Sequence, residues 1–136
     1  QEKVRYIMDT FYGNKPDALS GNDDCGQMSA WYIFNTMGFY PTAPSSNVYN
    51  LGSPGLAAVD MKMSNGKHLR MTTGNWSARN VFVKEVYLNG KKYDKSYITY
   101  NDIKDGADLH FVMSSRPNYK RGVAERAVPP SVSEKR

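Results

Sequence analysis

The spacing of the apolar residues changes once along this chain, near residue 44, from the period of a helix to that of a strand. Before this point, apolar side chains recur every three or four residues, as on the buried side of a helix. After it they alternate with polar residues, as in a half-buried strand. We therefore expect an α+β fold, helical in residues 1–44 and an antiparallel β-sheet or sandwich in residues 45–115. The polar residues 116–136 favour a disordered tail.

The first helix is expected in EKVRYIMDTFYG, where Val4, Ile7, Met8 and Phe11 form one apolar stripe. Gly13 is a natural end for this helix. Since the sequence opens at Gln1 directly in a helical pattern, without an initiator methionine, we expect the chain to be a piece of a longer protein.

The second expected helix, CGQMSAWYIFNTM, is apolar on nearly all sides. Asp24 is its expected N-cap, Gln27 follows three residues later as in a capping box, and Gly38 ends it. A helix without a polar face is normally covered on every side. One further helix cannot cover it, so we expect it to belong to a larger helical assembly.

Two Asn-Gly pairs, at residues 65–66 and 89–90, predict β-hairpins because alternating apolar residues flank both. In the second hairpin, Phe82, Val86 and Leu88 are expected on one face. The stretch SYITYNDIKDG then predicts a short strand and a single helical turn. The last strand, DLHFVMSS, is expected to direct its alternate apolar residues inward.

Composition and charge limit the classes of function. Hydrophobic residues make up 40% and charged residues 23%, which allows a packed core. The net charge of +5 is scattered, so we do not expect nucleic-acid binding. No apolar run approaches the length of a membrane span. Cys25 is the only cysteine and is interpreted as structural, and His68 and His110 lack partners at the spacing of a zinc site.

The stretch SGNDDCGQMSAW places two adjacent carboxylates, Asp23 and Asp24, at the entrance of the second helix. As a cap, Asp24 would accept backbone N–H groups and stabilise the helix by about 1 kcal/mol, with Asp23 solvated. As a functional group, a carboxylate at a helix N-terminus is stabilised as the anion, which suits a metal ligand or a group that positions water. Gly21 and Gly26 would allow a substrate to approach closely. The residues alone leave both interpretations open.

Two long stretches, LSGNDDCGQMSAWYIFNTMGFYPTAPSSNVYNLGSP and VYLNGKKYDKSYITYNDIKDGADLHFVMSSRPN, resemble the C-terminal signature of family 92 glycoside hydrolases. These enzymes are calcium-dependent, exo-acting, inverting α-mannosidases. The resemblance extends to about Asn118 and implies a parent protein with a β-sandwich domain followed by an α/α toroid, of which residues 1–44 would be the end. It further implies calcium as cofactor, a glycan with α-1,2-linked mannose as substrate, and a secreted, periplasmic or cell-surface location of the parent.

The resemblance implies that Asp24 is the general base that activates water. The family often has a second Asp two positions earlier, but this chain has Asn22, which can orient water and cannot accept a proton. Asp24 would then act alone or with Asp23. An inverting enzyme needs its two carboxyl groups roughly 6.5–9.5 Å apart across the sugar, so these neighbours cannot be the acid–base pair. The general acid is expected outside the chain, and Asp24 is the candidate calcium ligand by position.

Other residues near the motif have two possible roles each. Gln27 is expected either to bind substrate or to complete the cap. Tyr40, which follows Phe39, either lines a substrate pocket or has only a packing role. Trp31 and Tyr32 would form a sugar-stacking platform or, as is more frequent for aromatic residues within a helix, core.

Three functional hypotheses follow. The first is the C-terminal part of an exo-α-mannosidase, inactive as an isolated fragment because it lacks the general acid. The second is a non-catalytic carbohydrate-binding or structural β module. The third is a relative in which Asn22 has abolished catalysis.

Overall fold

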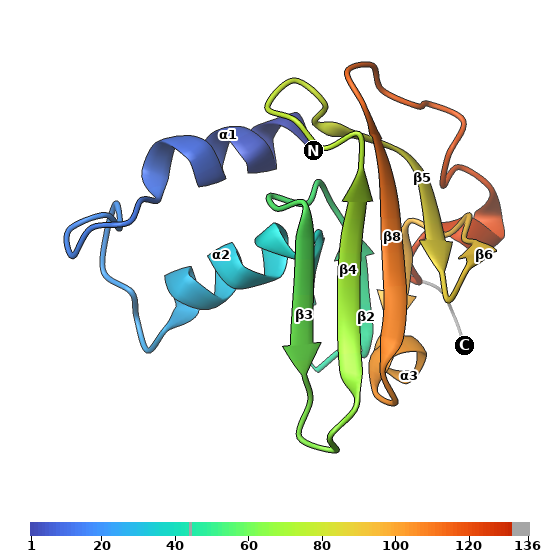
Figure 1. Ribbon diagram of the computed structural model, residues 1–136, viewed down its shortest axis with the longest axis horizontal. Helices are drawn as coiled ribbons and strands as arrows, with labels where there is room; N and C mark the ends of the chain where they lie inside the picture. The colour runs from blue at the N-terminus through green and yellow to red at the C-terminus, as the bar shows by residue number, and fades with distance from the viewer. Residues whose placement is uncertain (44, 132–136) are drawn as a thin grey trace.

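The computed structural model describes residues 1–43 and 45–131. Its elements follow in the order α1 (Glu2–Phe11), α2 (Gln27–Thr36), β1 (Phe39–Tyr40), β2 (Val48–Leu51), β3 (Ala58–Lys62), β4 (His68–Gly74), β5 (Phe82–Leu88), β6 (Lys91–Lys92), β7 (Tyr97–Thr99), α3 (Tyr100–Ile103), β8 (Ala107–Ser114) and the 3₁₀-helix η1 (Glu125–Ala127). The two long helices precede the strands, and they extend to one side of them (Figure 1). The α+β class is therefore confirmed.

The strands form two sheets. A three-stranded antiparallel sheet has the order β1-β2-β7, and a five-stranded sheet has the order β3-β4-β8-β5-β6. In the larger sheet β8 pairs antiparallel with β5 and parallel with β4, so the expectation of a purely antiparallel β region is wrong. The reason is topological: β8 enters last, between the two hairpins, and can run opposite to only one of its neighbours. Alternating apolar residues do not specify which strands pair.

Both predicted hairpins are confirmed. The turn between β3 and β4 has Gly66 at φ 80°, and it closes with a bond from the Met63 N–H to the Lys67 carbonyl at 2.8 Å. The turn between β5 and β6 is a two-residue loop in which Asn89 and Gly90 have φ values of 50° and 76°. Positive φ at both positions is the geometry for which Asn-Gly is favoured.

The face assignment of β5 differs from the prediction. Val83 and Val86 are both buried, although an uninterrupted strand would direct them to opposite faces. The pairing of β5 with β8 shifts between Val83 and Glu85, which marks a β-bulge. Because a bulge adds one residue to one strand, the inward side moves from odd to even positions along β5. Phe82 was therefore wrongly grouped with Val86.

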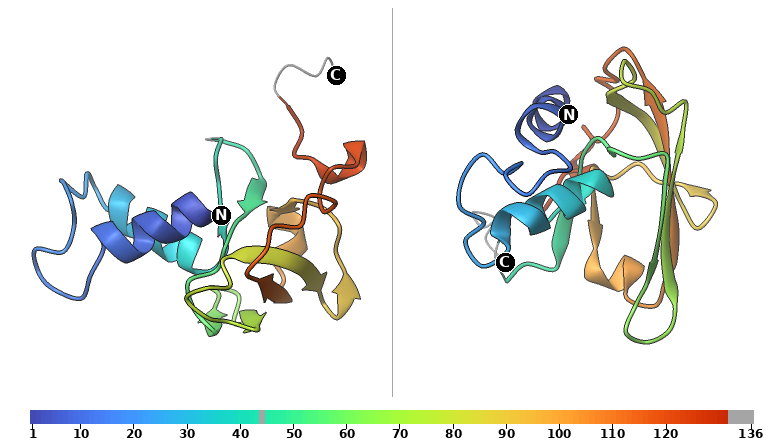
Figure 2. Two further views of the ribbon diagram at one scale, coloured as in Figure 1. Left: turned by 90° about the horizontal axis from the view of Figure 1, so that it is seen from above. Right: turned by 60° about the vertical axis from the view of Figure 1, so that its left-hand side comes forward.

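The core lies between the two sheets, with α3 and the end of α2 beside them (Figure 2). The last strand contributes most, since its alternate residues Leu109, Phe111 and Met113 are each exposed by 2% or less, as predicted. The smaller sheet contributes buried residues to the same core, among them Phe39 on β1 and Ile98 on β7. The predicted single helical turn is α3, which begins with a capping box between Thr99 and Asp102 and is likewise confirmed.

The long helices are anchored to the β part at one end only. On α1, Met8 is buried and the Arg5 guanidinium donates to the Pro54 carbonyl at 2.7 Å, whereas Phe11 at its far end is exposed. On α2, Ile33 is 56% exposed. Within the described residues, α2 is thus not covered on every side, as a helix of its composition normally is.

Residues 116–131 do not form the disordered tail that was expected. The Asn118 side chain donates to the Lys84 carbonyl at 2.9 Å, and Ala127 is buried. The Ala127 carbonyl accepts both the N–H and the hydroxyl of Ser96, each at 2.8 Å. The expectation is wrong for this segment because its polar side chains bond to exposed backbone of the sheet region. Residues 132–136 and Pro44 lie outside the described residues.

Candidate functional site

The predicted site lies in the loop of residues 12–26, at the ends of α1 and α2 that point away from the sheets (Figures 1 and 2). This loop enters α2 through three consecutive left-handed residues, Asp24, Cys25 and Gly26, with φ values of 44°, 60° and 86°. A left-handed conformation costs a non-glycine residue roughly 1–2 kcal/mol, and it concentrates at functional sites. The turn closes with a bond from the Gln27 N–H to the Asp23 carbonyl at 2.7 Å.

The cap of α2 is Asp23, not Asp24. One carboxylate oxygen of Asp23 accepts the Ser29 N–H at 2.8 Å, and the other accepts the Ser29 hydroxyl at 3.0 Å. The position directly before the helix is Gly26, which has no side chain to cap with, so the expected capping box with Gln27 is wrong as well. The left-handed turn explains this difference, because it separates Asp24 from the first helical N–H groups.

Asp24, Asn22 and Gln27 are exposed. In residues 1–43 and 45–131 no side-chain hydrogen bond or ion pair engages the Asp24 carboxylate. The two adjacent acids are therefore unequal, since each carboxylate oxygen of Asp23 accepts a hydrogen bond from Ser29 and those of Asp24 accept none from this part of the chain. Chemically, the Asp24 carboxylate is the more accessible of the two to a water molecule or a ligand. Cys25 is exposed beside it, and its interpretation as a structural residue stays a prediction.

An aromatic group supports the loop from the side of α1. The Tyr12 ring stacks on Trp31 and Tyr32, with ring centroids 5.6 and 4.8 Å away, and its hydroxyl donates to the Met28 carbonyl at 3.2 Å. Trp31 and Tyr32 therefore pack within the chain, as aromatic residues inside a helix usually do. Tyr32 keeps 39% of its surface exposed.

Tyr12 also connects the acidic loop electrostatically to β1. Burial raises its pKa, and the nearby Asp23 and Tyr40 raise it further, because negative charge disfavours the phenolate. Tyr40 is half-buried on β1, edge-on to the Phe34 ring at 6.2 Å. The structure thus brings Asp23, Tyr12 and Tyr40 into one neighbourhood, while Asn22, Asp24 and Gln27 share the exposed loop.

The described residues do not build a calcium site by themselves. Calcium takes six to eight oxygen ligands. No group of three or more His, Cys, Asp or Glu residues able to hold a metal ion occurs in the described part of the chain. Asp24 would supply one carboxylate, and the oxygens of Asp23 are engaged by Ser29.

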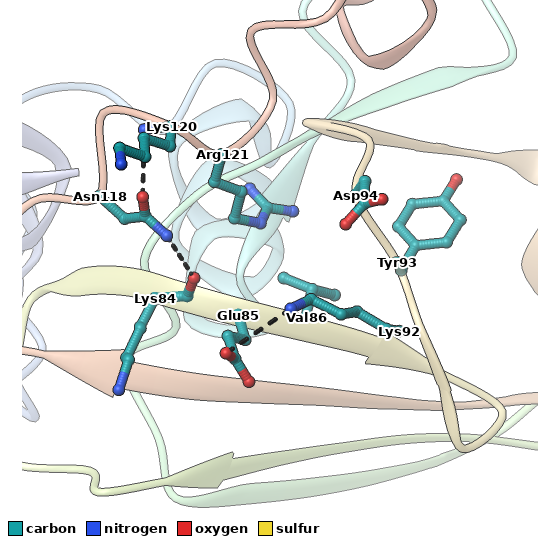
Figure 3. Close-up of a pocket in the computed structure, with 9 residues that line it drawn as sticks. All are labelled: Lys84, Glu85, Val86, Lys92, Tyr93, Asp94, Asn118, Lys120 and Arg121. Carbon is teal, nitrogen blue, oxygen red and sulfur yellow. Dashed lines mark hydrogen bonds and ion pairs between the residues drawn. The ribbon is translucent and has the colours of Figure 1, made fainter.

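A separate hollow of about 200 Å³ lies in the β part, between β5, β6 and residues 118–121 (Figure 3). Arg121 crosses it, and Lys92 forms an ion pair with Glu85 at 3.7 Å on its floor. The hollow is lined by Lys84, Glu85, Val86, Lys92, Tyr93, Asp94, Asn118, Lys120 and Arg121. None of the predicted site residues belongs to it.

Comparison with known proteins identifies the family. Residues 1–115 match the model of the glycosyl hydrolase family 92 catalytic domain. The chain belongs to glycosyl hydrolase family 92. Of the helices in its described part, none is both long and apolar enough to cross a membrane.

Solved family 92 structures share its fold. A family GH92 α-mannosidase from Bacteroides thetaiotaomicron is 66% identical, with a TM-score of 0.94 over 98% of this chain and 18% of that chain. The structure of that enzyme with mannoimidazole gives 67% identity and a TM-score of 0.93, over 97% of this chain and 17% of that one. An inverting GH92 mannosidase from Bacteroides thetaiotaomicron VPI-5482 is 33% identical, with a TM-score of 0.88 over 98% and 18% of the two chains.

A curated relative from Arthroderma benhamiae, described as an uncharacterized secreted glycosidase, is 29% identical over 89% of this chain and 16% of its own length. The chain thus spans less than a fifth of the length of these relatives.

Sequence reasoning missed Ser29 and Tyr12. Ser29 is the third residue of α2, a position whose N–H has no acceptor within the helix, and this was the available signal. Tyr12 had no comparable signal, because its contacts depend on how α1 lies against α2.

Proposed function

We propose that this chain supplies the water-activating carboxylate of a calcium-dependent, inverting exo-α-mannosidase that removes α-linked mannose, at α-1,2 linkages, from glycans. Asp24 is the base. The observation that carries this proposal is the inequality of the two acids: Ser29 occupies both oxygens of Asp23, and Asp24 is exposed in a left-handed turn.

The role fits the chemistry of inversion. The base must stand on the opposite face of the sugar from the acid, with room for a water molecule between them. An exposed carboxylate in a hydrogen-bonded turn can meet that water, whereas part of the acceptor capacity of the capping carboxylate is used by Ser29. Asn22, in the same loop, can orient the water through its amide.

The remaining machinery is proposed to lie in the rest of a longer protein. The chain covers 18% of the similar α-mannosidase, so a parent of that size has room for the general acid and most calcium ligands. In the parent, residues 1–44 would complete an α/α toroid that covers the exposed side of α2. The secreted glycosidase among its relatives supports a secreted or cell-surface parent.

The test is Asp24→Asn in the full-length protein, assayed with an aryl α-mannoside and an α-1,2-linked mannobiose. Loss of a general base typically lowers the rate by a factor of about 10² to 10⁴, and we expect a fall of kcat in this range. Asp17→Asn is the matched control, because it removes an exposed carboxylate from the same loop and should leave kcat unchanged. Normal turnover by Asp24→Asn would refute the proposal, as would mannoside hydrolysis by the isolated 136-residue chain.

A further inference from the structure

We propose that Ser29 is a positioning residue for the reaction: it holds Asp23 in an internal cap and so fixes the turn that presents Asp24. This inference rests on the proposed function, since it concerns the geometry of the same base. Ser29 lies in the first turn of α2 and is half-buried, whereas Asp24 is exposed in the left-handed turn before the helix.

The contacts of Asp23 attach the loop to α2 at both side chain and backbone. Its two carboxylate oxygens accept the N–H and the hydroxyl of Ser29, at 2.8 and 3.0 Å. Its carbonyl accepts the N–H of Gln27 at 2.7 Å and that of Met28 at 3.3 Å. Residues 24–26 lie between these attachments, and each of the three has a positive φ. An unfavourable conformation persists only where surrounding contacts impose it, and here these bonds impose it.

Ser29 is suited to this role because it donates twice from one residue. A backbone N–H alone would occupy one oxygen of Asp23 and leave the carboxylate free to rotate. The added hydroxyl bond fixes both oxygens, and this keeps Asp23 from approaching the water as a second base. A shift of about 1 Å in a reacting group is enough to lower a rate 10²-fold, so the fixed turn matters for catalysis.

The experiment compares Ser29→Ala, which loses the hydroxyl, with Ser29→Thr, which retains it, in the full-length protein. We expect Ser29→Ala to lower kcat by about 10- to 100-fold with KM changed less than about threefold, and Ser29→Thr to restore most of kcat. Ser77→Ala is the control, since Ser77 also makes one local bond, to the Asn80 N–H at 3.1 Å, but lies in the β part. It should leave kcat unchanged.

A kcat of Ser29→Ala within twofold of the unsubstituted enzyme would overturn the inference, and so would equal losses in Ser29→Ala and Ser29→Thr. Asp24→Asn separates this failure from that of the proposed function. If Asp24→Asn is inactive while Ser29→Ala is normal, the base assignment stands and the positioning role falls.

A second measurement does not depend on the Ser29 variants folding. Ser29 is the third residue of α2, so its N–H has no acceptor within the helix, and only the Asp23 carboxylate protects it from exchange with solvent. Slow amide hydrogen exchange at Ser29 in the unsubstituted protein, becoming fast in Asp23→Ala, supports the inference. Exchange at the rate of an unstructured chain in the unsubstituted protein overturns it.

Discussion

Substitution of Gly38 by Ala tests how α2 is joined to the core. Gly38 ends α2 with φ +87°, and its N–H and carbonyl bond to Asn35 and Gly52 at 2.9 and 2.8 Å. A Cβ there would lie 3.0 Å from the Phe111 ring and 3.1 Å from the Cβ of Pro54. Phe111 has no exposed surface and cannot move away without disturbing the sheet.

Two costs add in this variant. The left-handed conformation costs an alanine about 1 to 2 kcal/mol, and overpacking of a tight core costs about 1 to 3 kcal/mol more. Gly38→Ala should therefore lower the free energy of unfolding by about 2 to 5 kcal/mol. Gly66→Ala is the matched control: its φ is +80°, but nothing lies within 4 Å of the added Cβ, so only the conformational cost applies.

The assay is urea unfolding of both variants beside the unsubstituted chain. With a slope of about 2 kcal/mol per molar, a difference of about 2 kcal/mol separates the two midpoints by about 1 M. Combining Gly38→Ala with Phe111→Leu should cost less than the sum of the single changes, because the shorter side chain relieves the contact. Equal destabilisation by Gly38→Ala and Gly66→Ala would refute the steric argument.

Two further predictions concern polar contacts. Thr99→Ala removes the hydroxyl bond to Asp102 at 2.8 Å, and it should lower the free energy of unfolding by about 1 kcal/mol in the same assay. The hydrogen bond with His68 holds the pKa of Asp60 below its ordinary value of 3.8. A carboxyl whose pKa is lowered by folding stabilises the protein above its unfolded pKa, and this contribution is lost as the pH falls below about 3.8. Unfolding of Asp60→Asn followed from pH 6 to pH 3 should therefore show a shallower loss of stability than the unsubstituted chain, and a parallel loss would contradict the assignment.

Much of the local structure could be predicted because its cause is local. Asn89-Gly90 forms its turn wherever two alternating strands flank it, since both residues tolerate positive φ. Likewise Leu109, Phe111 and Met113 had to share a face, because side chains alternate along a strand.

The insertion of β8 between β4 and β5 could not be predicted in this way. Which strands pair depends on how completely whole faces of the sheet are buried. The backbone edge of every alternating strand presents the same hydrogen-bonding groups, so the local sequence does not distinguish between partners. The bulge between Val83 and Glu85 has the same origin, because it adjusts the register of β5 to β8, and the local sequence of β5 does not specify β8 as its partner.

The candidate site was found by its motif, but the roles of its residues were not. The sequence indicated a capping acid before α2 and assigned the cap to Asp24, the nearer acid. The three left-handed residues reverse this assignment, and Asp23 reaches Ser29 instead. Two non-glycine residues in this conformation have no clear sequence signal, because only the surrounding bonds make it favourable.

The sequence by itself determined the helices, the hairpin turns, the inward strand residues and the acidic motif of a family 92 hydrolase, because each depends on residues within about one turn or one strand of each other. Only the tertiary structure decided that β8 lies between the hairpins and that residues 116–131 return to the sheets. The physical reason is that these outcomes depend on contacts whose alternatives have nearly equal local energies. The packing of the whole chain selects among them.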